Sequence, residues 1–133
     1  MIRKDLRRRA PFAVIMCAAM LSGPAAAGSA QPMTAKDAGA RYGQALGALE
    51  ICHGSKITDK AKALGDAYSG AEQDAFKTQA AKVFAAWNTV KHCAKQIDPN
   101  QCKIIMDKSC ETAEAEIGAA GSVLSGLVEF MKR

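Results

Sequence analysis

The chain has 133 residues, with 18 lysines and arginines against 13 acidic residues, which gives a formal net charge of +5. Residues 1–30 hold five of the basic residues and one of the acidic ones, so the rest of the chain carries a net charge of only +1. This balance removes the electrostatic argument for a nucleic-acid or anionic-membrane partner.

Residues 1–30 have the order of regions that is typical of a secretory signal peptide. A basic head precedes an apolar run over 10–21, and small residues at Ala27 and Ala30 offer cleavage sites. A membrane-spanning helix needs about twenty apolar residues, so this run is too short. We therefore expect a cleaved signal peptide, a periplasmic or secreted protein that is not integral to a membrane, and a single helical domain over 31–133.

Helical patterns with capping residues recur after the leader, whereas alternating strand patterns are nearly absent. Thr34 begins a capping-box pattern ahead of a helix over 35–53, which Gly54 would end. Thr58 is a suitable N-cap for a short helix over 59–69.

The strongest helical pattern covers residues 70–97. Ser69 and Glu72 form a capping box, and Phe84 widens the apolar stripe that follows. The stripe itself advances by alternating steps of four and three residues, through Phe76, Ala80, Val83, Trp87, Val90, Ala94 and Ile97. A continuous seam of this kind also suits a coiled-coil partner surface, but we interpret it as the central helix of a small bundle.

A further helix is predicted to begin at Asp98 and Pro99, an N-cap followed by a proline at the first helical position. Because proline disfavours a helical residue before it, the previous helix should end near Ile97 and form a tight antiparallel hairpin with this one. Its inward face would carry Cys102, Met106, Cys110, Ala113 and Ile117.

The last predicted helix covers residues 122–131 and has an apolar stripe followed by Lys132 and Arg133. We interpret the stripe as a core-facing surface, although an interfacial membrane anchor or a partner helix has the same pattern. Phe130 lies off the stripe and would mark a contact site if it were exposed. The predicted fold is thus all-α, a small disulfide-stapled bundle of four to five helices.

Four cysteines follow the leader, and four cysteines allow three pairings. Cys102 and Cys110 lie about 12 Å apart along one helix, which is too far for a disulfide. Cys93 and Cys102 are equidistant from the hairpin turn and should face each other, which leaves Cys52 to pair with Cys110. The sequence therefore predicts the disulfides Cys93–Cys102 and Cys52–Cys110. A redox pair fits less well, since CxxC spacing is absent. A metal thiolate cluster also fits less well, because adjacent histidine and cysteine side chains point about 100° apart on a helix.

The two histidines are His53 and His92, and each is adjacent to a cysteine. If the helix ends that carry them meet, the two imidazoles are candidate ligands for copper or haem together with Met106 or Met131. The alternative interpretation is two partly exposed histidines near helix ends, where a cation suits the helix dipole.

Catalytic patterns are missing from the sequence. There is no G-x-S-x-G, no HExxH, no glycine-rich phosphate loop and no EF-hand loop. The acids at Asp107, Glu111, Glu114 and Glu116 are interleaved with Lys103 and Lys108 and suit a solvated helix face. We therefore expect a protein that is not an enzyme and has no resident cofactor.

The predicted function is a non-catalytic binding module or chaperone that takes a protein or an apolar small molecule. The expected contact residues are Trp87, Phe84 and Phe130, around a groove between the helices predicted over 70–97, 99–117 and 122–131. The alternative is a periplasmic metal or haem carrier that uses His53 and His92.

Overall fold

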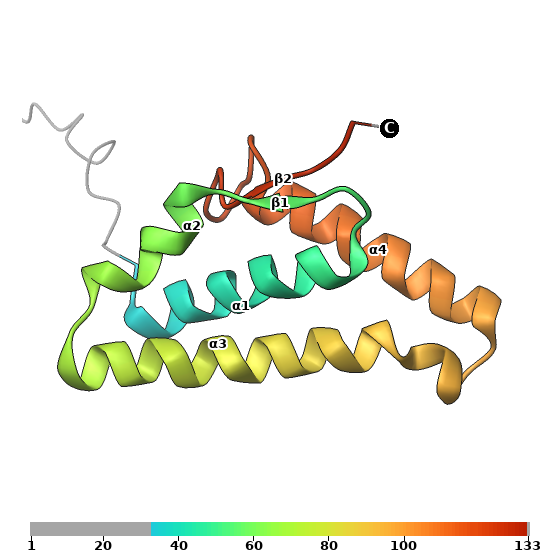
Figure 1. Cartoon of the computed structure of the whole chain (residues 1–133), viewed down its shortest axis with the longest axis horizontal. Coiled ribbons are helices and arrows are strands. Elements are labelled where there is room, and N and C mark those ends of the chain that lie inside the picture. The colour runs from blue at the N-terminus through green and yellow to red at the C-terminus, as the bar shows by residue number, and fades with distance from the viewer. Residues whose placement is uncertain (1–32, 133) are drawn as a thin grey trace, which may run out of the picture. The chain divides into compact units, whose positions relative to one another are not determined.

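The computed structural model describes residues 33–132, which belong to one compact unit of the chain. The predicted signal peptide lies outside the described residues. The described part is mostly helical, with the α-helices α1 (Ala35–Ile51), α2 (Asp59–Ala63), α3 (Gly70–Lys91) and α4 (Pro99–Ile117). Figure 1 shows α1 between α3 on one side and α4 with two short strands on the other.

Helix α1 begins and ends close to where the sequence predicts. The Thr34 hydroxyl accepts a hydrogen bond from the Asp37 amide at 3.1 Å, and donates one to the Asp37 carboxylate at 2.7 Å. These bonds satisfy an amide that has no partner inside the helix. At the other end, Gly54 has a positive φ of 72°, a conformation that glycine adopts without strain.

Helices α1 and α3 run parallel and pack closely through glycines. A Cβ atom on Gly39 would collide with the backbone of Phe76, and one on Gly47 would collide with the Trp87 side chain. Between them, a Cβ on Gly43 would lie 3.0 Å from Ala80 Cα. The contacts advance in the same direction along both helices, which shows that the helices are parallel. The four-residue spacing of the glycines leaves one face of α1 without side chains, so α3 can approach it closely.

A parallel pair needs a connection that returns the chain to its starting end, and residues 52–69 provide it. Strand β1 (Lys56–Ile57) is followed by α2 and a 3-10 helix, η2 (Leu64–Ala67). The single helix predicted over 59–69 is therefore wrong in extent. The α-helix changes to a 3-10 helix at Leu64, and the backbone is extended at Tyr68. Thr58 caps α2 as predicted, since its hydroxyl accepts from the Ala61 amide at 3.2 Å.

Helix α3 ends six residues earlier than predicted. It stops at Lys91, and a short 3-10 helix, η3 (Cys93–Lys95), leads to the turn before α4. The predicted capping box at its start is also wrong, because the Ser69 side chain makes no capping hydrogen bond. The apolar seam is buried only where α1 covers it: Phe76 and Ala80 are buried, whereas Ala94 and Ile97 are exposed.

Helix α4 confirms the predicted start. The Asp98 carboxylate accepts hydrogen bonds from the Asn100 amide at 2.8 Å and the Gln101 amide at 3.3 Å. The hairpin of α3 and α4 extends beyond the end of α1 and opens away from its tip (Figure 1). The hairpin is therefore less tight than predicted, because α1 packs against both helices further from the turn.

The helix predicted over 122–131 does not form. Residues 118–127 make turns, and strand β2 (Val128–Glu129) pairs antiparallel with β1, with Ile57 opposite Val128. Gly126 adopts a φ of 79°, which interrupts any helix at that point. The Leu127 amide donates to the Ile117 carbonyl at 3.0 Å, so this segment folds back on the last turn of α4.

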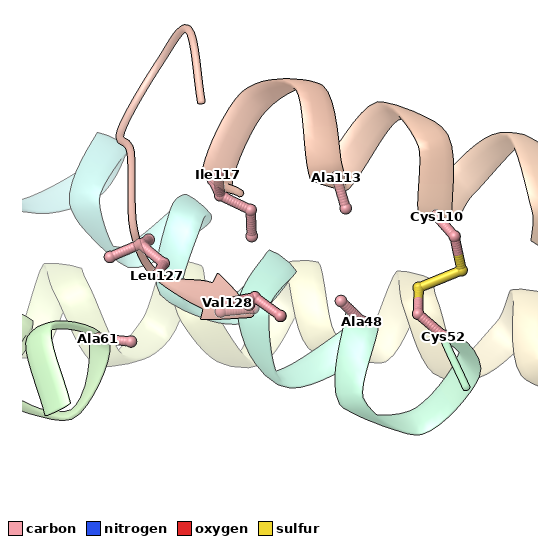
Figure 2. Packing of buried hydrophobic residues seen from close by; sticks show 9 residues of the cluster. Ala48, Cys52, Ala61, Cys110, Ala113, Ile117, Leu127 and Val128 are labelled. Atoms are coloured by element: carbon pink, nitrogen blue, oxygen red, sulfur yellow. A yellow bond between two sulfur atoms is a disulfide. The ribbon is translucent and has the colours of Figure 1, made fainter. Parts of the chain in front are cut away.

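The main core cluster lies between α1, α4 and the C-terminal segment (Figure 2). Ile117, Leu127 and Val128 are the largest fully buried side chains, and small residues such as Ala48 and Ala113 fill the rest. A second cluster packs Phe76 with the N-terminal end of α1, where its ring lies 5.5 Å from that of Tyr42. The core is thus distributed along α1 and does not extend to the hairpin tip.

Both predicted disulfides are confirmed. Cys52 bonds to Cys110 with Cα atoms 5.6 Å apart, and Cys93 bonds to Cys102 with Cα atoms 5.5 Å apart. Figure 2 shows the first of them at the edge of the main core, where it joins the end of α1 to α4. Disulfides persist in oxidising surroundings, so two of them fit an extracellular or secreted protein.

Candidate functional site

A groove of about 500 Å³ separates α3 from α4. Ala86, Trp87 and Val90 line it from α3, and Ile104 and Ile105 line it from α4. Gln44 of α1 forms part of the floor, and Lys108, Ser109 and Thr112 complete the α4 wall. The groove is therefore walled by two helices and floored by a third.

The isoleucines of this groove are unusually exposed for large apolar side chains. Ile104 is 53% exposed and Ile105 is 41% exposed, and both follow the poorly covered turn that contains Ile97, which is 40% exposed. On α4 these positions lie away from the inward stripe of Cys102, Cys110, Ala113 and Ile117, all of which are buried. An apolar surface that faces solvent beside a cleft marks a contact site.

A polar cluster holds α1 against α4 beneath the groove. The Gln44 side chain is 7% exposed. Its amide nitrogen donates to Glu116 Oε2 at 2.6 Å, and its amide oxygen accepts from Arg41 at 2.9 Å. Arg41 also contacts the same Glu116 oxygen at 2.7 Å. Both polar atoms of the buried Gln44 side chain have a partner, and the bonds to Glu116 fix the relative position of the two helices.

A second pocket, of about 620 Å³, lies on the opposite flank of α4. Residues advance by about 100° around a helix, which places Met106 and Cys110 on one side of α4 and Ile105 and Lys108 on the other. This pocket surrounds the Cys52–Cys110 disulfide, and we call it the disulfide pocket. Its lining residues are Ile51, Cys52, His53, Lys103, Met106, Asp107, Cys110, Glu111, Glu114, Phe130, Met131 and Lys132.

The structure separates the three predicted contact residues. Trp87 lines the groove, as expected, and is half-buried against α1. Phe84 is half-buried on α3 but does not line the groove. Phe130 is half-buried, packs against the main core and lines the disulfide pocket. Since the C-terminal segment folds against α1 and α4, it forms no wall of the groove.

The two histidines also occupy different surroundings. His53 follows α1 and lines the disulfide pocket, whereas His92 ends α3 and lines neither the groove nor that pocket. Both are exposed. Within residues 33–132, no group of three or more histidine, cysteine, aspartate and glutamate residues is arranged to hold a metal ion.

Sequence reasoning missed Ile104, Ile105 and Gln44. The sequence offers a signal for the two adjacent isoleucines, because they lie on α4 outside its predicted inward stripe. Large apolar residues outside such a stripe are expected to be exposed. Gln44 gives no comparable signal, since its partner Glu116 is 72 residues away.

The comparisons with known proteins found no match: no family model, no curated protein and no solved structure is similar to this chain. Among the described residues, none of the helices combines the length and the apolar character needed to cross a membrane.

Proposed function

We propose that this protein is a non-catalytic binding module of the periplasm or the extracellular space. Its binding site is the groove between α3 and α4, and its ligand is the apolar face of an amphipathic helix from a partner protein. The observation that carries the proposal is the exposure of Ile104 and Ile105, at 53% and 41%, beside Trp87 in a groove of about 500 Å³.

A helix suits this groove better than a compact ligand does. Trp87 and Val90 lie about one turn apart on α3, and Ile105 and Lys108 lie about one turn apart on α4. Side chains spaced in this way match apolar anchors at i and i+3 or i+4 of an incoming helix. The bound helix would pack on the floor formed by α1 and complete a four-helix arrangement.

The rim of the groove supports an amphipathic ligand in particular. Lys108, Ser109 and Thr112 border the apolar walls, and the Lys108 ammonium contacts Glu111 at 3.1 Å. Polar groups at the rim would face the polar side of the bound helix, while the isoleucines would bury apolar area at about 25 cal/mol per Å². The predicted leader and the two disulfides support a periplasmic or secreted location.

Trp87 fluorescence tests the proposal directly, because Trp87 is the only tryptophan of the chain. We would titrate the protein with an amphipathic peptide of leucine and lysine at helical spacing. We expect a saturable blue shift of the emission. The double variant Ile104→Ser/Ile105→Ser should weaken binding at least tenfold, as estimated from the lost burial of two isoleucines.

Val123→Ser is the matched control, since Val123 is also 41% exposed but lies outside the groove. It should bind the peptide like the unmodified protein. Equal weakening in both variants would show that binding is unspecific. A saturating response to a fatty acid, with none to the peptide, would show that the ligand is a small apolar molecule instead of a helix.

A further inference from the structure

We propose that the disulfide pocket is a binding site for a soft monovalent metal ion, Cu(I). The ligands are the His53 imidazole and the thioether sulfurs of Met106 and Met131. This site lies on the other flank of α4 from the groove, so the proposal is independent of the proposed function. It also replaces the pairing of His53 with His92 by a different set of ligands.

Three separate segments bring the proposed ligands to one pocket. His53 lies in the turn after α1, Met106 lies in α4, and Met131 follows β2. The turn and Met131 are in direct contact, because a Cβ atom on Gly54 would collide with Met131 Cε. Glycine at position 54 thus lets the Met131 side chain lie over the turn that carries His53.

The surroundings of His53 and Met131 leave their donor atoms available. Among residues 33–132, no hydrogen bond or ion pair engages the His53 side chain. Met131 is 63% exposed, more than any other large hydrophobic residue of the described chain. Met131 therefore contacts Gly54, the residue next to His53, and is otherwise largely open to solvent.

Met106 contributes the third donor from the pocket wall. It is half-buried, and its sulfur lies 3.9 Å from Cys102 Sγ. A methionine side chain has three rotatable bonds and adapts readily to its surroundings. Metal binding requires a rotamer change that turns the Met106 sulfur from Cys102 toward the pocket that it lines.

The chemistry of this set selects a soft ion. Thioether and imidazole groups suit Cu(I), whereas Mg²⁺ and Ca²⁺ need several oxygen ligands. Zn²⁺ binds thiolate, imidazole and carboxylate groups instead of thioethers, and the cysteines beside the pocket supply no thiolate because they form a disulfide. Asp107 and Glu111 also line the pocket, but ion pairs with Lys103 and Lys108 balance their charges, so the thioether and imidazole groups decide which ion binds.

The test is a titration with Cu(I), kept reduced by ascorbate in the absence of thiols so that the disulfides stay intact. Protein labelled with ¹³C at the methionine methyl groups reports each sulfur separately. We expect the Met106 and Met131 signals to shift together and to saturate at one equivalent. His53→Ala and Met131→Leu should each weaken binding at least tenfold. Zn²⁺ should leave both signals in place.

Two matched controls distinguish a built site from adventitious binding. His92→Ala removes an equally exposed histidine outside the pocket, and Met33 is a half-buried methionine at the other end of α1. Binding should be unchanged in His92→Ala, and the Met33 signal should not move. Stationary Met106 and Met131 signals, or equal weakening in His53→Ala and His92→Ala, would overturn the proposal. Circular dichroism of each variant would confirm that it is folded.

Discussion

Cys52 and Cys110 join the C-terminal end of α1 to the middle of α4 across a sequence separation of 58 residues, and both are buried in the main core. The other bridge, Cys93–Cys102, closes a separation of only 9 residues at a hairpin tip that α1 does not cover. The two disulfides therefore constrain different parts of the fold, one the core and the other a projecting hairpin.

Removal of the two disulfides should lower the free energy of unfolding by different amounts. The chain-entropy model gives about 4 kcal/mol for the long loop and about 2.5 kcal/mol for the short one. We expect Cys52→Ala/Cys110→Ala to lower the free energy of unfolding more than Cys93→Ala/Cys102→Ala, since its loop is longer and both of its cysteines belong to the main core cluster. Urea denaturation of both variants measures this difference. If both variants lost the same free energy of unfolding, the conclusion that only the Cys52–Cys110 disulfide belongs to the main core would be contradicted.

The close packing of α1 on α3 predicts an unusual response to alanine at Gly43. Alanine normally stabilises a helix by about 1 kcal/mol relative to glycine. Here the added Cβ would lie 3.0 Å from both Ala80 Cα and Val83 Cβ, so Gly43→Ala should instead destabilise the protein by about 1–3 kcal/mol.

Ala81→Gly on the exposed face of α3 is the control for this experiment, because it reports helix propensity without a packing change. Ala81→Gly should lower the free energy of unfolding by about 1 kcal/mol. Both variants are measured by chemical denaturation. A Gly43→Ala protein that is more stable than the original would show that the two helices do not approach as closely as described.

The polar cluster beneath the groove predicts a role for Glu116 that its neighbours lack. Glu116→Ala leaves the buried Gln44 amide and Arg41 without their shared acceptor, and an unsatisfied buried group costs about 1–3 kcal/mol. Glu114→Ala, two residues away on the exposed face, should change stability by no more than about 0.5 kcal/mol. Thermal denaturation of the two variants would reveal the difference, and coincident melting curves would refute it.

The C-terminal segment should stabilise the fold through its buried side chains. Leu127 is fully buried in the main core, so Leu127→Ala should cost about 2–5 kcal/mol. Val123 is exposed, and Val123→Ala should have little effect. The measurement is again the free energy of unfolding in urea. If the segment were a peripheral helix, the two substitutions would have similar effects.

Local signals account for the parts of the fold that the sequence predicts well. The start of α4 follows from Asp98 and Pro99, because an N-cap and a proline act within one turn. The disulfide pairing follows from helix geometry, since the distance between Cys102 and Cys110 along α4 excludes their bonding to each other. The groove was predicted from amphipathic stripes on three helices, but only Trp87 of the three expected contact residues lines it, and residues 122–131 form none of its walls.

The parts that were missed depend on contacts between distant segments. Residues 122–131 have a helical pattern, but Gly126 in a left-handed conformation and the burial of Leu127 against α4 override it. The parallel pairing of α1 with α3 was likewise not predicted, although glycines at 39, 43 and 47 indicate a face for close helix contact. The disulfide pocket combines three segments, and their positions follow only from the tertiary fold.

The nested order of the disulfides has a consequence for maturation of the chain. Cys52 precedes Cys93 and Cys102, yet its partner Cys110 is synthesised last. Of these four cysteines, only Cys52 and Cys93 would be present for an oxidant that acted before Cys102 was synthesised. A disulfide between them would have to be rearranged by thiol–disulfide exchange, whereas oxidation after the synthesis of α4 would need no rearrangement.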